Sequence, residues 1–180
     1  PGRSLPVFRG EMVIETNVFE ILGILQDIER NPEWMHACID AKRIKKINHK
    51  EYIAYNRSDA PWPISDRDVV VHAKAEIDRD KRELAIRMRS IEMPDFQQSD
   101  DVVRMPRLNG HYFFKELGPR KTWIEYEIDA DPGGSIPGWL VRMASRDIPL
   151  ITLKNLRERV KVTEKAGTYA AYIKSIEHLK

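Results

Sequence analysis

The side chains that most often carry out catalysis or bind metals are sparse in this sequence. Its histidines are His36, His49, His72, His111 and His178. None has a second ligand at His-x-x-x-His or a similar spacing, and the only cysteine, Cys38, excludes both a Cys-x-x-Cys site and an internal disulfide. We therefore predict no metal site and no cofactor.

Acid-base and nucleophilic chemistry has no better support. The carboxylate pairs Asp100-Asp101 and Asp129-Asp131 lie in or next to predicted turns, where solvated or capping roles are usual. Gly133-Gly134 lacks the Lys and Ser or Thr of a phosphate-binding loop, and no Gly-x-Ser-x-Gly elbow is present. His111 adjoins Tyr112, which is expected to face inward, but strand alternation then directs His111 outward. We predict no catalytic residues.

The composition fits one globular domain. The 180 residues carry a formal net charge of +2 from 30 basic and 28 acidic side chains, a balance that argues against a nucleic-acid partner. No apolar run approaches the ~20 residues that cross a bilayer, and the chain begins Pro1-Gly2-Arg3 without Met or a signal peptide. We expect a soluble monomer with a single domain over 1–180, a core at 6–162 and a C-terminal helical extension at 163–180.

The element expected to position any site is a long helix near the C-terminus. A turn at 131–134 leads to Ser135, a good N-cap, and apolar residues then recur every three or four positions up to Val160. The pattern then weakens, so that residues 163–180 either extend the helix past Gly167 or form a second short one. The broad apolar side of the long helix needs cover, and the upstream segments are nearly all strands.

About seven strands, mostly antiparallel, and one early helix precede the long helix. Alternating apolar and polar residues predict strands at 6–15, 38–47, 51–59, 67–78, 83–91, 102–116 and 121–130. Thr16 or Asn17 caps an amphipathic helix that runs to about Arg30, where Asn31-Pro32 ends it. The polar segment 92–101 is predicted to be an exposed loop. The expected fold class is α+β, with a sheet wrapped around the long helix.

The strand faces that look toward the helix carry small side chains. Along 67–78, Val71, Ala73 and Ala75 share one face, and Ile86 continues that face on the next strand. Small inner side chains leave an internal volume, whereas a packed core needs larger ones. The alternative is that side chains of the helix fill the space over the alanines.

Three segments carry a family resemblance through their order and spacing. Residues 61–68 read PWPISDRD, residues 131–140 read DPGGSIPGWL, and Pro149 and Leu156-Arg157 follow in the long helix. The first resembles the Pro-aromatic-Pro segment and Arg-Asp strand start of the START lipid-transfer domains, and the others resemble the last helix of that family. The resemblance spans about residues 6–162 and implies that the family's N-terminal helix and first strand or two are missing here.

The resemblance implies a helix-grip fold, in which a curved antiparallel sheet wraps around the C-terminal helix and encloses a hydrophobic tunnel for one lipid-like molecule. Some members place an acid and an arginine on neighbouring inner strands, and the matching positions here are Ala54 and Ala73. Phosphatidylcholine-binding members hold the head group around the turn after the first helix, where this sequence has Asn31 and Met35. We therefore expect a ligand whose end is neutral and weakly polar, or wholly apolar.

Ligand contacts and a gate follow from the same pattern and resemblance. The predicted ligand-cavity residues are Ala54, Asn56, Ser58, Trp62, Val71, Ala73, Ala75, Ile86, Met88, Tyr112, Phe114, Ile124, Tyr126, Leu140, Met143, Ala144 and Ile151. The predicted gate residues are Pro61, Trp62, Pro63, Gly133, Gly134 and Gly138. Trp62 could instead be a structural plug beneath the start of the helix. Arg67 and Asp68 are expected to form a structural ion pair or loop anchor.

Two functional hypotheses stand. The first is a carrier or sensor that binds a lipid or other hydrophobic molecule and contacts a membrane surface transiently. The second is an enzyme similar to polyketide cyclases and aromatases, which use such a cavity and need polar groups at the reacting carbons. The inner face offers few such groups, so the sequence favours the carrier. Basic residues along the late helix could dock on anionic membrane, but a solvated helix face is the expected explanation.

Overall fold

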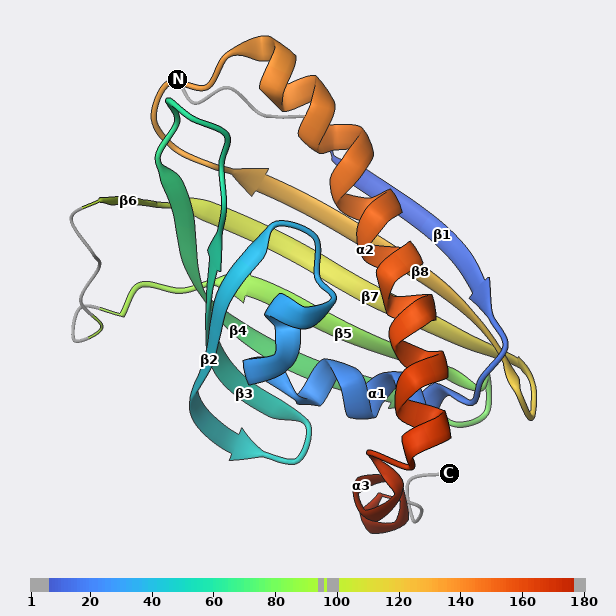
Figure 1. The fold of residues 1–180 in the computed structure, drawn as a ribbon. Coiled ribbons are helices and arrows are strands. Elements are labelled where there is room, and N and C mark those ends of the chain that lie inside the picture. The colour runs from blue at the N-terminus through green and yellow to red at the C-terminus, as the bar shows by residue number, and fades with distance from the viewer. Residues whose placement is uncertain (1–6, 94–95, 97–100, 177–180) are drawn as a thin grey trace.

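A curved sheet wraps around one side of the long helix α2 (Gly138–Ala166) in a computed structural model of the protein. The structure describes residues 7–93, 96 and 101–176, and for Trp139 and residues 141–145 it describes the backbone alone. Within these residues the sheet has eight strands. Figure 1 shows α2 crossing the concave side of the sheet, with the early helix beside its C-terminal part. The α+β class and the helix-grip arrangement are confirmed.

The strands pair in the order β1-β8-β7-β5-β4-β3-β2, and β6 joins β4. Their bounds are β1 (Phe8–Ile14), β2 (Cys38–Asn48), β3 (Glu51–Ser58), β4 (Asp66–Asp78), β5 (Glu83–Ser90), β6 (Val102–Arg104), β7 (Arg107–Gly118) and β8 (Lys121–Asp131). The other helices are α1 (Val18–Gln26), the 3-10 helix η1 (Ile28–Glu33) and α3 (Ala170–Ser175). No helix in the described part of the chain is long and apolar enough to span a bilayer.

The C-terminal half of α2 packs directly on the core. Leu153, Leu156 and Val160 are at most 1% exposed and belong to the main hydrophobic cluster. Gly10 on β1 permits this close approach, because a Cβ there would lie 3.0 Å from Cβ of Pro149 and 3.1 Å from Cδ1 of Leu153. The helix is therefore anchored from its middle to its C-terminus, and its N-terminal half is left to cover the space beyond.

The early helix is shorter than predicted. Asn17 caps α1 by accepting a hydrogen bond from the backbone N–H of Glu20, and α1 ends at Gln26. The chain then continues as η1, which includes Pro32. The predicted helix end at Arg30 is wrong, because apolar residues three and four positions apart suit either helix type and do not mark the change between them.

The predicted strand 102–116 is two strands. β6 ends before Met105, and β7 begins after Pro106. A proline has no N–H to donate to a ladder and restrains the residue before it, so the strand breaks at this point. β6 runs parallel to the start of β4, with Val102 opposite Asp66. The sheet is thus antiparallel along its main path and carries one short parallel strand.

The long helix begins later than predicted. Ser135 is not its N-cap, because Ile136 precedes Pro137 and a residue before proline avoids the helical conformation. The helix therefore starts directly after Pro137. It ends before Gly167, whose φ of 62° lies in the left-handed region that favours glycine at a helix end. The separate helix α3 follows, so extension of the long helix past Gly167 is wrong.

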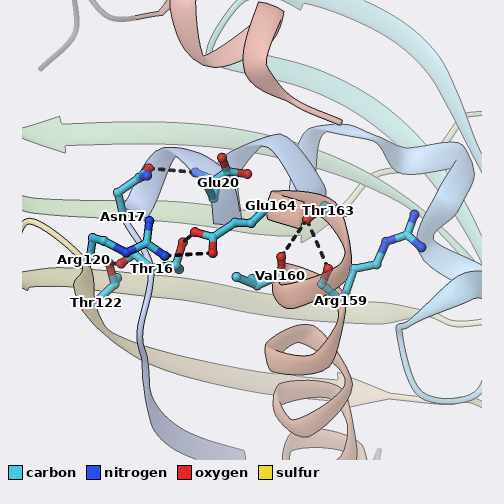
Figure 2. Close-up of polar contacts among 9 residues, drawn as sticks. All are labelled: Thr16, Asn17, Glu20, Arg120, Thr122, Arg159, Val160, Thr163 and Glu164. Carbon is cyan, nitrogen blue, oxygen red and sulfur yellow. Dashed lines mark hydrogen bonds and ion pairs between the residues drawn. The ribbon is translucent and has the colours of Figure 1, made fainter. Parts of the chain in front are cut away.

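A polar network fastens the last turns of α2 to the turn after β1 and to the β7–β8 hairpin (Figure 2). The carboxylate of Glu164 accepts a hydrogen bond from the hydroxyl of Thr16 and pairs with Arg120 at 3.0 Å. The Thr122 hydroxyl donates to the backbone carbonyl of Thr16 at 2.9 Å. Thr16 and Thr122 are fully buried. The C-terminal end of the helix is therefore held by a partly buried hydrogen bond and an exposed ion pair as well as by packing.

Candidate ligand cavity beneath the long helix

A cavity of about 440 Å³ lies between the N-terminal half of α2 and the inner face of the sheet. The roof includes Leu140 and Ile148 of α2, and the floor is formed by side chains of β3, β4, β5, β7 and β8. Leu25 and Ile28 close one side from α1 and η1. Most of this wall is apolar, as a site for a hydrophobic molecule requires.

Many of the predicted cavity residues lie on this wall. They are Ala54, Asn56, Ser58, Val71, Ile86, Met88, Tyr112, Tyr126 and Leu140. Ala54 is fully buried, and its small side chain leaves volume where a larger one would close the cavity. The contact of these residues with a ligand stays a prediction.

Other predicted cavity residues lie elsewhere, and their assignment to the wall is corrected. The described residues of this group that do not line the cavity are Ala73, Ala75, Phe114, Ile124 and Ile151. Ala73, Phe114 and Ile124 are fully buried in the solid core, and Ala75 packs against that core. Strand alternation predicts which face of the sheet a side chain is on. It does not predict where along the strands α2 packs against that face. The side chains of Met143 and Ala144 lie outside the described residues.

Trp62 neither lines the cavity nor plugs it. Its side chain is 92% exposed, whereas its neighbours Pro61 and Ile64 line the cavity. The peptide bond between Trp62 and Pro63 is cis. A segment between two prolines follows no strand alternation, so the sequence pattern could not give the direction of the indole. The loop places Trp62 on the surface beside the cavity.

Three further predicted gate residues lie between the end of β8 and the first residue of α2, inclusive. Gly133 and Gly134 both have φ of 65°, a conformation that L side chains rarely adopt. Gly133 also packs closely on Pro106, because a Cβ there would lie 3.0 Å from the Pro106 Cδ. Gly138 is the exposed first residue of α2. Their role as a gate stays a prediction.

Arg67 and Asp68 hold the segments around the cavity in place. The guanidinium of Arg67 donates to three backbone carbonyls, those of Ser65, Pro132 and Gly133. Burial lowers the pKa of Arg67. The carboxylate of Asp68 is fully buried and accepts two hydrogen bonds from Arg104, at 2.7 and 3.0 Å. Arg67 thus anchors the loop, and Asp68 forms a structural ion pair that joins β4 to β6.

The polar wall residues that come from the helices were not among the predicted cavity residues. Asn31 of η1 is 4% exposed, and its Nδ2 donates to Oδ1 of Asn56 at 3.2 Å. Thr152 of α2 is fully buried and lies on the cavity wall. The sequence contained one indication of this. Thr152 is a polar residue among the buried apolar positions of the helix, and a buried polar side chain usually makes a hydrogen bond.

Three tyrosines lie on the sheet side of the cavity. Tyr52, Tyr112 and Tyr126 all line it. The rings of Tyr112 and Tyr126 stack with their centroids 4.4 Å apart. Burial raises the pKa of Tyr52 to about 12 and also raises the pKa of Tyr112 and of Tyr126. These phenols therefore stay protonated at neutral pH and offer hydrogen bonds rather than charge.

A cluster of one histidine and two glutamates lies on the outer face of the sheet. His111 Nε2 is 2.9 Å from Oε1 of Glu125, and His111 Nδ1 is 3.9 Å from Oε1 of Glu127. One ligand atom from each of these residues lies within 4.8 Å of the others. Sequence spacing could not find this group, because Glu127 is the cross-strand partner of His111. Arg9 also pairs with Glu125, so the cluster is part of an ion-pair network.

Solved structures share this arrangement. The STAR-related lipid transfer protein (fragment 25–204) from Xanthomonas axonopodis is 29% identical, with a TM-score of 0.78 and coverage of 87% of this chain and 86% of that one. Human STARD10 is 22% identical, with a TM-score of 0.78 and coverage of 91% and 68%. BexL, a di-domain ARO/CYC protein, is 10% identical at a TM-score of 0.55, which is a likeness of fold alone.

Related sequences agree. An uncharacterised protein of Pseudomonas aeruginosa is 32% identical over 156 residues, which are 87% of this chain and 76% of that protein. START domain-containing protein 10 of Mus musculus is 25% identical over 137 residues, or 46% of its length. Phosphatidylcholine transfer protein of Mus musculus is 24% identical over 133 residues, or 59% of its length. The family model of the START domain matches residues 5–165. The chain therefore belongs to the START domain family.

Proposed function

We propose that this protein binds one lipid or other hydrophobic molecule in the cavity, and that it carries or senses this molecule without catalysis. The observation that carries the proposal is an apolar cavity of about 440 Å³ roofed by the N-terminal half of α2. The names of related proteins, which include lipid transfer proteins, support the same class of ligand.

Apolar burial alone supplies enough free energy for this role. An acyl chain gains about 0.8 kcal/mol for each methylene moved out of water, so a chain of about ten methylenes gains roughly 8 kcal/mol before the cost of ordering it. We do not propose phosphatidylcholine, which some related proteins bind, as the ligand of this protein. Asn31 and Met35 stand where a charged head-group pair would be expected. No charged anchor is required for binding of this strength.

The chemistry of the wall argues against an enzyme of the cyclase type. A general base that acts at neutral pH must be unprotonated at that pH, so that it can accept a proton from the substrate. The pKa values of Tyr52, Tyr112 and Tyr126 are all raised by burial, so these phenols are poor bases. Asp147 and His36 also line the cavity, but the Asp147 carboxylate is paired with Arg146 at 2.7 Å and interacts with His36. The carrier remains the better-supported function.

The proposal includes a transient contact with a membrane, from which a hydrophobic ligand must be taken. Trp62 is 92% exposed on a loop whose neighbouring residues Pro61 and Ile64 line the cavity. An indole is well suited to the boundary between lipid and water, because it has an apolar body and one polar N–H. The same loop could therefore touch the bilayer and admit the ligand.

Extraction from liposomes tests the proposal. Liposomes that contain a fluorescent acyl lipid are mixed with the protein and separated by size-exclusion chromatography. We expect the probe to elute with the protein at about one molecule per chain. Trp62→Ala should slow extraction without lowering the final amount bound, whereas Ile39→Ala, another exposed apolar residue, should have no effect. Failure of the folded protein to retain any probe would refute the carrier.

A further inference from the structure

The size of the cavity beneath α2 limits the size of its guest. Its volume is about 440 Å³. An engineered apolar cavity of about 150 Å³ in another protein binds one benzene molecule, so each carbon atom of a guest needs on the order of 25 Å³. At that ratio the cavity holds about 17 carbon atoms. One long acyl chain fits this volume, whereas the two chains of a diacyl lipid need roughly twice as much.

The cavity has no room to extend further along the sheet, because the core beyond it is solid. On β4, Val71 lines the cavity, whereas Ala73, the next residue on the same face, is fully buried in the core. On β7, Tyr112 lines the cavity, and Phe114, the next residue on that face, is fully buried in the core. Close-packed cores resist the insertion of further groups. The inner end of the cavity is therefore fixed at this level of the two strands.

The cavity meets solvent beside the loop that follows β3. Among the described wall residues, Asp59 and Pro61 of this loop are the exposed ones, and the others are buried or half-buried. We call residues 59–61 the rim. A polar group of a guest keeps its hydration at the rim, while an apolar chain can reach the interior behind it.

The interior offers no partner for an anionic head group. Among the described wall residues the basic side chains are Arg67 and His36. Arg67 already donates to three backbone carbonyls, and His36 interacts with the carboxylate of Asp147. A phosphate or carboxylate drawn into the cavity would lose its hydration without compensation. Such a head group therefore stays at the rim.

We infer that the cavity holds one acyl chain of about 17 carbon atoms, with its tail at the inner end and the polar end of the lipid at the rim. The ligands of this protein are then lipids with a single chain, such as monoacylglycerols, fatty alcohols or lysophospholipids, and lipids with two long chains are excluded. This inference rests on the proposed function, because it assigns a class of ligand to the same cavity.

The length of the chain should decide how much of a single-chain lipid the protein takes from a membrane. A methylene that moves from the bilayer into the cavity exchanges one apolar environment for another, so lipids that fit should be taken about equally well. A chain too long for the cavity keeps its outermost methylenes in water at the rim. Each of these should lower the amount bound about fourfold, which is the ratio that corresponds to the transfer of one methylene.

Competition among lipids in one membrane tests the inference. Phosphatidylcholine vesicles that carry dipalmitoylglycerol and saturated monoacylglycerols of about 10 to about 22 carbons are mixed with the protein, which is then separated by size-exclusion chromatography. Mass spectrometry compares the bound lipids with those in the vesicles. We expect the bound share to be nearly constant up to about 17 carbons and then to fall about fourfold for each further carbon. Dipalmitoylglycerol and phosphatidylcholine should each be recovered at least about tenfold below the share of palmitoylglycerol.

Two substitutions in the wall should move this length limit in opposite directions. Ala54→Leu fills space at the wall and should make the limit about three carbons shorter. Ile86→Ala opens space and should make the limit about three carbons longer. Ile148→Ala does the same from the half-buried roof and replaces Ile86→Ala if that variant does not fold. Ala166→Leu and Ile39→Ala make the same changes at exposed positions and should leave the limit unchanged.

The possible results distinguish the single-chain ligand from the carrier function itself. Recovery of dipalmitoylglycerol or phosphatidylcholine at the same share as palmitoylglycerol would overturn the single-chain ligand and leave the carrier in place. A length limit that does not move in Ala54→Leu or in the enlarged variant would also overturn it, because the chain would then lie outside this cavity. Recovery of no lipid at all, by protein shown to be folded by circular dichroism, would instead overturn the proposed function.

Discussion

The hydroxyl of Thr16, in the turn after β1, donates a hydrogen bond to the carboxylate of Glu164, 148 residues further along the chain in α2. Arg120, on the β7–β8 hairpin, binds the other oxygen of the same carboxylate. The bond fastens the end of the long helix that packs on the core, at the opposite end from the half that roofs the cavity (Figures 1 and 2). Movement that admits a ligand is therefore expected at the start of α2.

Thr16→Val should lower stability without changing the cavity. The substitution removes a partly buried hydrogen bond to a charged acceptor, for which about 1.5–3 kcal/mol is typical. Urea unfolding measures the change. Thr168→Val, at an exposed position after α2, is the control and should change the free energy of unfolding by less than about 0.5 kcal/mol. Equal effects of the two substitutions would refute the role assigned to Thr16.

The two bidentate Arg–Asp pairs of the sheet should differ in strength because they differ in burial. The Asp68 side chain is fully buried against Arg104, whereas the Asp129 side chain is 35% exposed against Arg107. Asp68→Asn leaves a partly buried guanidinium without its counter-charge and should cost about 3 kcal/mol. Asp129→Asn should cost about 1 kcal/mol or less. Urea unfolding of both variants measures the difference, and similar losses would contradict the argument from burial.

Glu20 should make stability depend on pH. Burial and the nearby charge of Glu164 raise the pKa of Glu20, while Arg120 acts in the opposite direction. The folded state therefore holds the Glu20 proton more tightly than the unfolded state, and ionised Glu20 costs stability above its folded pKa. Glu20→Gln should raise the melting temperature at pH 7, and this gain should shrink as the pH falls toward the ordinary value of 4.5.

Glu158 provides a control of opposite sign for that experiment. Lys161 lowers the pKa of Glu158, which lies on the exposed side of α2. Glu158→Gln should therefore give a small loss of stability at pH 7, and this loss should shrink as the pH falls below the ordinary value of 4.5 and through the lowered pKa of the folded state. A gain from Glu20→Gln that does not change with pH would contradict the electrostatic explanation.

Ala54→Trp should block the cavity. Ala54 is fully buried on the wall, so an indole at this position occupies the space that a ligand would use. Probe uptake should fall at least about tenfold while the far-ultraviolet circular dichroism spectrum stays unchanged. Ala166→Trp adds the same side chain at an exposed position and should leave uptake unchanged. Full uptake by the folded Ala54→Trp protein would count against the cavity as the binding site.

The sequence predicted the fold well because its signals are local and regular. Alternation placed nearly every strand, and motifs such as the one at residues 61–68 predicted the family. The errors fall where a proline or a change of helix type interrupts the pattern. Pro106 divides a predicted strand, Pro137 delays the start of the long helix, and η1 continues the apolar spacing of α1 in a different geometry.

The candidate site was only partly predictable, because strand alternation gives the face of a residue but not what covers it. Ala54 and Ala73 lie on neighbouring strands and are both fully buried, yet only Ala54 lines the cavity. The difference is set by the place where α2 meets the core, which is a tertiary property. For this reason Ala73→Trp, at a residue that the sequence placed in the cavity, should destabilise the core instead of closing the cavity.

The central claim is that the interior holds one hydrophobic guest, and native mass spectrometry of protein purified from cells tests it most directly. We predict a population heavier than the bare chain by the mass of one small molecule, and loss of that extra mass on denaturation and in Ala54→Trp. A spectrum that contains only the bare chain, from protein that also takes up no added lipid, would contradict it.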